Sequence, residues 1–190
     1  EASKKAFIVN RVGDLGFLLG IIFCYASLGT TDLAELAKIF QTDPSKASTA
    51  MGLLIMCGFL GKSAQFPLQV WLADAMAGPT PVSALIHAAT MVVAGVYLVA
   101  RLFPVYYFET PEVLHGVAYL GAFTSLFAAV IACVQTDIKR VLAFSTISQI
   151  GFMMVALGVS GYGGHNGTGY MAGMFHLFTH AMFKALLFLG

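Results

Sequence analysis

The sequence predicts an all-α protein, a polytopic transmembrane helix bundle of about six spanning segments with one helix broken near Pro67. Composition is the first observation behind this prediction: 58% of the 190 residues are hydrophobic and only 10% are charged, against about a quarter in soluble domains. Apolar runs near the ~20 residues that a bilayer requires recur along the chain. A proline interrupts the second of these runs.

The expected spans are separated by polar, Gly-rich or Pro-rich connections. The spans are Phe7 to Leu28, Ala50 to Ala77 with an interruption, Val82 to Phe103, Val113 to Val134, Ile138 to Val159, and Tyr170 to Gly190. Residues 30–48 are long enough for a short surface helix, 104–113 predict a Pro-punctuated turn, and 160–169 predict a Gly-rich loop. We expect one transmembrane domain over residues 1–190, the central piece of a longer chain.

Lys62 stands in the middle of the second apolar run. About 11 residues into a helix that rises ~1.5 Å per residue, its ammonium would lie roughly 16 Å deep, near the midplane of the bilayer. Insertion there costs about 2.5–3.5 kcal/mol, and the side chain is too short to reach the headgroups comfortably. A functional group that faces a protein-lined or wet interior therefore explains Lys62 better than a structural residue does.

Pro67 predicts that this second run is not one straight helix. Proline lacks an N–H and clashes with the carbonyl four residues back, so the helix should break near Gln65 to Pro67 and resume through 68–76. Broken helices inside a membrane are tolerated where they line a cavity, and transporters place ion sites there. A simple kink without a cavity is the alternative.

Titratable side chains recur inside the later apolar runs. His176, His180 and Lys184 follow each other at four-residue spacing and therefore share one helix face. Imidazole has a free pKa near about 6.5 and passes protons, so this stripe is a candidate proton relay. A di-His metal site ranks well below it, because no carboxylate or cysteine ligand lies nearby in the sequence. His87 lies in another apolar run, where a lone histidine is more often a hydrogen-bonded packing residue.

Lys139 allows two interpretations. It opens a helix beside Asp137, which suits an interfacial anchor as well as it suits a functional lysine. Ser145, Ser148 and Gln149 continue a polar strip along the same helix, and such a strip suits a hydrated interior face more than lipid.

Charges at the ends of the spans predict the orientation. Alternating the sides places five cations where the chain begins: Lys4, Lys5, Arg11, Lys139 and Arg140. The opposite side holds Lys38, Lys46 and Arg101 among most of the acids, so the positive-inside rule makes the starting side cytoplasmic. Asp14, one turn after Arg11, is compatible with a surface i, i+3 pair. A net charge of +1 leaves no basic field for nucleic acid.

Three segments resemble the antiporter-like, proton-translocating membrane subunits of respiratory complex I, of the subunit L type. They are Gly61 to Arg101, Val134 to Met153 and Phe175 to Leu189, and the resemblance covers nearly the whole chain. It implies a central fragment of an antiporter-like fold built on two inverted repeats. It also implies roles: Lys62 matches the lysine of the first discontinuous helix, His87 a relay group on the next helix, and Lys139 a buried central lysine rather than an anchor.

The resemblance further assigns the stripe of His176, His180 and Lys184 to the stretch that leads towards the exit path, and Asp14 to the input region. The implied function is proton translocation coupled to NADH:quinone electron transfer, as a subunit of an enzyme whose redox chemistry lies elsewhere. Flavin, iron–sulfur clusters and quinone are then expected on other subunits, and this chain is expected to hold no cofactor and no metal.

The implied partners are other membrane subunits of complex I, including neighbouring antiporter-like subunits, together with the lipid bilayer and protons. The implied location is the bacterial plasma membrane, as a multi-pass protein. Two related alternatives are the large subunit of a multisubunit cation/proton antiporter and a subunit of a membrane-bound hydrogenase. A purely structural scaffold is a third, and the cost of several buried cationic or imidazole sites argues against it.

Overall fold

The structure is a computed structural model that describes residues 1–43, 46, 48–88, 90–109, 111–160 and 167–190, and in these ranges it contains helices and no strand. The elements are α1 (Ala2–Leu28), α2 (Leu33–Thr42), α3 (Thr49–Lys62), α4 (Val70–Asp74), η2 (Ala75–Ala77), α5 (Thr80–Ala88), α6 (Met91–Arg101), α7 (Phe103–Glu109), α8 (Pro111–Cys133), α9 (Ile138–Val159) and α10 (Thr168–Leu189). Within the described residues, five helical stretches are long and apolar enough to cross a membrane, one of them Thr80–Arg101, which comprises α5 and α6. The predicted all-α membrane bundle is confirmed.

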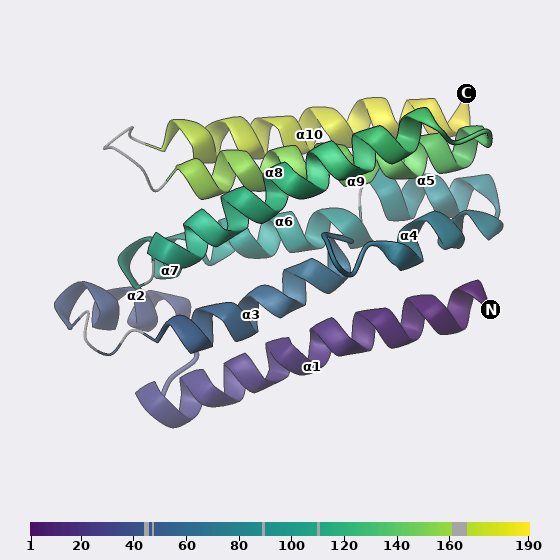
Figure 1. The fold of residues 1–190 in the computed structure, drawn as a ribbon. Coiled ribbons are helices and arrows are strands. Elements are labelled where there is room, and N and C mark those ends of the chain that lie inside the picture. Colours follow the sequence, from purple (N-terminus) through teal and green to yellow (C-terminus); the bar gives the residue numbers. More distant parts are fainter. Residues whose placement is uncertain (44–45, 47, 89, 110, 161–166) are drawn as a thin grey trace.

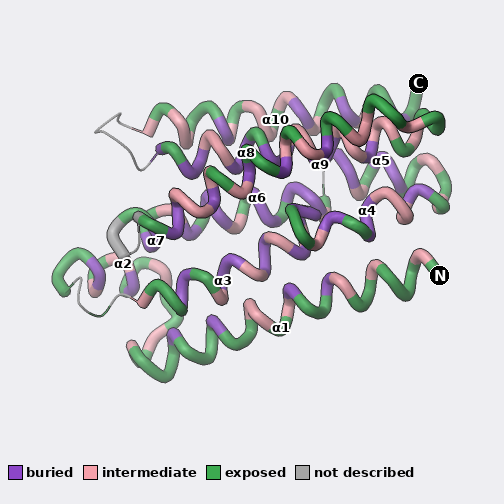
Figure 2. The backbone as a smooth tube through the Cα atoms, viewed as in Figure 1, coloured by how far each residue is buried: buried purple, intermediate pink, exposed green. Residues whose placement is uncertain are grey.

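The long helices lie side by side in one bundle (Figure 1). α1 packs against α3, α3 packs against α6, and α9 packs against both α8 and α10. Both chain ends lie at one end of this bundle, whereas α2 and α7 lie at the other (Figure 1). Buried positions gather on α3, α6 and α9, while α1 and α8 expose long outer faces (Figure 2). The interior therefore lies between α3, α5, α6, α9 and α10.

The second span is interrupted, as Pro67 predicts. α3 ends at Lys62 and the chain resumes as α4 at Val70. Between them the Phe66–Pro67 peptide bond is cis, and Ala64 has a φ of 49°, in the left-handed region that non-glycine residues rarely adopt. Lys62 is thus the last helical residue before the break.

Side chains from both sides of the break hold it in place. The Trp71 indole N–H reaches back and donates to the Gly61 carbonyl at 3.1 Å, in the last turn of α3. The Phe66 N–H donates to the hydroxyl of Thr124 on α8 at 3.2 Å. Because backbone groups in a membrane interior must find partners within the protein, these bonds stabilise an irregular segment at that depth.

The third expected span, Val82 to Phe103, is confirmed as a candidate span over Thr80–Arg101, and within it the structure separates α5 from α6. α5 ends and α6 begins on either side of Thr90, whose N–H and hydroxyl both donate to the Leu85 carbonyl, at 3.2 and 3.0 Å. This contact spans five residues and replaces the regular four-residue bond of an α-helix. The Ser63 hydroxyl donates to the Val92 carbonyl at 2.6 Å, so the two interrupted spans touch each other.

The connections differ from expectation at one place. The predicted surface helix is confirmed as α2, which Asp32 caps by accepting the N–H of Ala34. In its described residues, the range 104–113 expected to form a turn is helical instead, in α7 and the start of α8, while residue 110 lies outside the described residues. Pro104 and Pro111 stand in the first turns of these helices, where the missing proline N–H is not needed. The predicted Gly-rich loop lies largely at 161–166, outside the described residues.

Candidate functional site

The first part of the candidate site is an ion pair between α1 and α3. The Lys62 ammonium lies 3.0 Å from Oδ1 of Asp14, and an Arg11 guanidinium nitrogen lies 3.5 Å from Oδ2 of the same carboxylate. Lys62 thus directs its charge at a protein group, as predicted, although its side chain keeps 37% of its surface exposed on this chain. One carboxylate is shared by two cations.

Close packing of α1 on α3 brings this pair together. A Cβ on Gly13 would lie 2.8 Å from the Cys57 carbonyl oxygen and 3.1 Å from the Gly61 Cα, so only glycine fits there. Gly13 and Gly61 directly precede Asp14 and Lys62 in the sequence. The backbone contact therefore fixes the distance between the two charged side chains.

The second part lies between α9 and α10, which run antiparallel. The Lys184 ammonium donates to the Ser145 hydroxyl at 2.9 Å, and Nε2 of His176 lies 2.7 Å from Oε1 of Gln149. The predicted contact between the α10 stripe and the polar strip of α9 is thus confirmed for Ser145 and Gln149. Ser148 instead faces α8, where its hydroxyl lies 3.3 Å from that of Ser125.

His180 and His87 complete a buried cluster around Lys184. All three side chains have 0% exposed surface. Neither ring nitrogen of His87 or His180 has a hydrogen-bond partner among the described residues. α5 packs against α10, and the centroid of the His87 ring lies 5.1 Å from that of the Phe188 ring. His87 is also close enough to Lys184 and His180 to interact with them electrostatically. Helical spacing groups the residues of α10, but only the tertiary fold adds His87 to them.

A buried imidazole without a partner is costly, because its ring nitrogens have lost water without gaining another hydrogen bond. Such a group is retained where it exchanges protons or holds an ordered water. The cluster therefore combines one amine donor with two buried imidazoles. Chemically, it can accept, hold and release a proton inside the bundle.

Lys139 lies outside this cluster, and its expected role as a buried central lysine stays a prediction. It is the second residue of α9 and is half-buried rather than enclosed. Asp137 caps the helix by accepting the Lys139 backbone N–H at 3.0 Å, which makes this point the end of the span. In the described part of the chain, its ammonium forms no ion pair. This position suits the interfacial anchor of the alternative interpretation.

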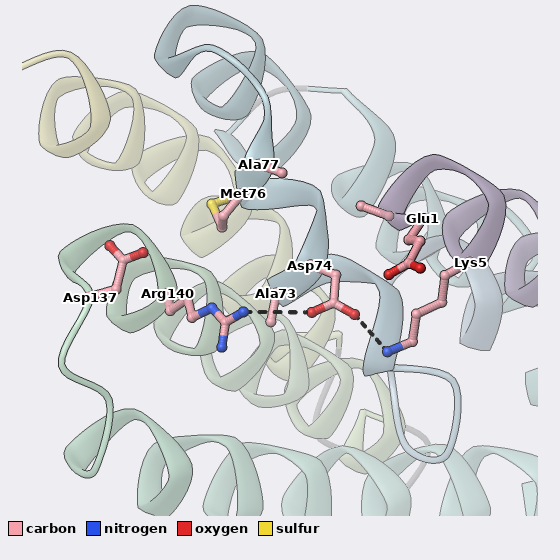
Figure 3. Close-up of a pocket in the computed structure, with 9 residues that line it drawn as sticks. Glu1, Lys5, Ala73, Asp74, Met76, Ala77, Asp137 and Arg140 are labelled. Carbon is pink, nitrogen blue, oxygen red and sulfur yellow. Dashed lines mark hydrogen bonds and ion pairs between the residues drawn. The ribbon is translucent and has the colours of Figure 1, made fainter.

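Asp74 is a charged, partly exposed residue that sequence reasoning missed. It follows the Pro67 break, and its carboxylate lies 2.6 Å from the Lys5 ammonium and 3.9 Å from an Arg140 guanidinium nitrogen (Figure 3). These residues line a cavity of about 560 Å³ together with Glu1 and Asp137. The ion pairs join α1, α4 and α9, and they place Lys5 and Arg140 at the same end of the bundle, as predicted. The signal in the sequence was a lone acid within an apolar run.

No group of three or more His, Cys, Asp or Glu side chains that could hold a metal ion is found within the described ranges. Interrupted helices and buried ionisable side chains are together typical of one class of polytopic membrane protein. In this class, ions or protons bind to groups inside the helix bundle. The chain belongs to the NADH:quinone oxidoreductase/Mrp antiporter transmembrane family, whose model matches residues 1–190.

Curated relatives match the whole chain. It is 52% identical over 189 residues to NADH-quinone oxidoreductase subunit L of Campylobacter jejuni and 54% identical over 192 residues to subunit L of Escherichia coli K12. It is 49% identical over 196 residues to the chloroplastic NAD(P)H-quinone oxidoreductase subunit 5 of Lotus japonicus. The chain spans 30%, 30% and 25% of the length of these three relatives, respectively.

Two solved structures share the fold. The Mrp complex from Dietzia sp. DQ12-45-1b superposes with a TM-score of 0.88 at 36% identity, over 99% of this chain and 20% of that chain. The membrane-bound sulfane sulfur reductase, an archaeal respiratory membrane complex, superposes with a TM-score of 0.87 at 30% identity, over 99% of this chain and 32% of that chain. The antiporter-like fold that the sequence implied is therefore confirmed.

Proposed function

We propose that this chain is part of a proton-translocating, antiporter-like membrane subunit of a respiratory NADH:quinone oxidoreductase. The observation that carries the proposal is the fully buried cluster of Lys184, His180 and His87. The names of the relatives that are 52% and 54% identical support the choice of complex. In this proposal the subunit sits in the bacterial plasma membrane.

The proton route that we propose uses two groups of side chains. Lys62 exchanges charge with the Asp14 carboxylate near one end of the route, and Lys184, His180, His87 and His176 carry protons between α5, α9 and α10. Lys139 joins this route from the end of α9. Ser145 and Gln149 hydrogen-bond to Lys184 and His176, and this polar face of α9 would let bridging waters pass protons between the groups.

Energetics fit a switch based on charge pairing. Moving one proton against ~200 mV costs about 4.6 kcal/mol. Two unit charges about 4 Å apart interact by about 4 kcal/mol at an effective dielectric constant of ~20. A shift of the Asp14 carboxylate between Arg11 and Lys62 therefore changes the energy of the Lys62 charge by an amount of the required order.

The redox chemistry of the complex lies outside this chain in the proposal. NADH oxidation, flavin, iron–sulfur clusters and quinone belong to other subunits, and the chain's own partners are further membrane subunits, including neighbouring antiporter-like ones. Redox turnover would act on this chain by perturbing one of its ion pairs. The disturbance then passes along the route as alternating pairing and repulsion.

A cation/proton antiporter of the Mrp type and a subunit of a membrane-bound hydrogenase are the main alternatives. Solved structures of an Mrp complex and of a membrane-bound sulfane sulfur reductase share the fold. The higher identity to relatives named as NADH-quinone oxidoreductase subunits favours complex I. Transport that requires sodium would favour the antiporter. A pure scaffold is disfavoured, because a structural role gains nothing from burying Lys184.

Replacement of Lys62 by arginine in the full-length subunit tests the proposal. Arginine can keep the pair with Asp14, but its guanidinium does not release a proton below a pH of about 12. We expect a stable, assembled complex whose proton pumping, measured with a pH-sensitive dye in proteoliposomes, is lost. Lys5→Arg is the matched control, because Lys5 also pairs with an aspartate and should need only a fixed charge. Normal pumping by Lys62→Arg would show that Lys62 does not carry protons.

A further inference from the structure

Arg101 stands between two apolar grooves at the end of the bundle away from the chain termini. The first groove has a volume of about 360 Å³ and lies between α1, α2, α3 and α6, with Ile21, Leu33 and Leu98 in its wall. The second has a volume of about 480 Å³ and lies between α6, α7 and α10, with Tyr170 and Met171 in its wall. Arg101 lines both grooves, which makes it the link between them.

The charge of Arg101 is not neutralised within the described part of the chain. The other two arginines, Arg11 and Arg140, have a carboxylate oxygen at 3.5 and 3.9 Å, but no acid lies within 4.0 Å of the Arg101 guanidinium. Arg101 is exposed and is the last residue of the Thr80–Arg101 span. The end of a span lies at the level of the lipid headgroups, so the free guanidinium is available to an anion at that level.

α2, which borders the first groove, has the character of a helix that lies at a membrane surface. Its inner face is apolar and buried through Leu36 and Phe40, while Lys38 points outward on the opposite face. A short amphipathic helix of this kind lies in the plane of the interface with its polar face to water. Leu36 also lines the first groove, so the interfacial helix forms part of the groove wall.

We propose that Arg101 and the two grooves form a binding site for one anionic phospholipid. The phosphate pairs with the Arg101 guanidinium, which presents several donors in a planar fork that matches phosphate oxygens. One acyl chain lies in the groove beside Ile21, and the other lies in the groove beside Met171. Both volumes fall in the range of pockets that hold small apolar ligands. This site is separate from the proton route and does not depend on it.

Native mass spectrometry of the full-length protein in detergent tests the site. The protein is mixed with phosphatidylglycerol or with phosphatidylcholine of the same chain length, and retained lipid is counted. We expect wild type to retain phosphatidylglycerol preferentially, and Arg101→Gln to reduce its occupancy about five- to tenfold, as for the loss of one cation near an anionic headgroup. Lys38→Gln removes the same charge from the same end of the bundle and should leave retention unchanged.

Two further variants test the grooves. Ile21→Trp and Met171→Trp replace partly exposed side chains with a larger one that fills the grooves, and each should lower retention without unfolding the protein. Excess inorganic phosphate should not displace the lipid, since most of the binding comes from the acyl chains. Equal retention by wild type and Arg101→Gln would overturn the proposal. It would also be overturned if phosphate alone competed fully, or if no lipid bound because another part of the full-length protein fills the grooves.

Discussion

Replacement of Lys184 by methionine should stabilise the protein and abolish its proton transfer at the same time. Lys184 has 0% exposed surface, its ammonium has one hydrogen bond, to Ser145, and in the described ranges no carboxylate lies within 4.0 Å of it. A mid-span lysine costs about 2.5–3.5 kcal/mol, and a hydrogen bond to a charged group returns about 1.5–3 kcal/mol. Methionine has a similar length, but it has neither the burial cost of the ammonium nor its hydrogen bond. The expected gain in unfolding free energy is therefore about 0–2 kcal/mol.

Two assays on the full-length subunit follow from this estimate. Titration with a denaturing detergent gives the free energy of unfolding, and a pH-sensitive dye in proteoliposomes gives the pumping rate. Pumping should fall to a tenth or less, because a positioned proton-transfer group contributes about a hundredfold or more. Lys38→Met, on the exposed face of α2, should change stability by no more than about 0.5 kcal/mol and leave pumping intact.

The opposite pattern would refute this reasoning. If Lys184→Met lowered the unfolding free energy by more than about 1 kcal/mol while the remaining folded protein pumped normally, Lys184 would be a structural residue. In that case its bond to Ser145 would contribute more to packing than its burial costs.

Three other predictions concern single contacts. Asp74→Asn should lower the unfolding free energy by up to about 2 kcal/mol, since it weakens two partly exposed ion pairs of about 0.2–1 kcal/mol each; a loss that does not shrink at high salt would contradict the assignment. Gly151→Val should cost about 1–3 kcal/mol in the same titration, because a Cβ there would lie 2.7 Å from the Gly121 carbonyl oxygen, and unchanged stability would show that α8 and α9 can separate. His180→Phe should fold and assemble but pump poorly, because a phenyl ring, unlike imidazole, cannot bind and release a proton; normal pumping would remove His180 from the route.

The features that the sequence predicted correctly depend on local chemistry. Pro67 predicts its helix break because the missing N–H and the ring clash act within one turn. The stripe of His176, His180 and Lys184 follows from helical periodicity alone. The polar residues of α9 could be anticipated as its partner, since a polar stripe within an apolar bundle requires a polar face opposite.

The features that were missed depend on tertiary contacts or on weak local signals. The interruption at Thr90 comes from hydrogen bonds that any threonine could make, and no proline or glycine marks it. Asp74 gains its importance only when α1 and α9 bring Lys5 and Arg140 to it. The start of α9 at Ile138 was predicted correctly, but the sequence alone left two interpretations of Lys139, because a lysine beside the capping Asp137 suits an anchor as well as a functional group.

The burial of Lys184 also bears on how the protein is made. α10 has a mean hydropathy of 1.3, the lowest of the five candidate spans, because two histidines and a lysine lie within it. Alone it would be a poor substrate for membrane insertion, since each such residue opposes partitioning into lipid. α9 and α5 precede α10 in the chain, so the face that receives Lys184 already exists when α10 leaves the ribosome. Correct insertion of α10 thus depends on helices synthesised before it. A variant that weakens the α9 face should therefore reduce the amount of correctly inserted protein before it reduces transport by the protein that is inserted.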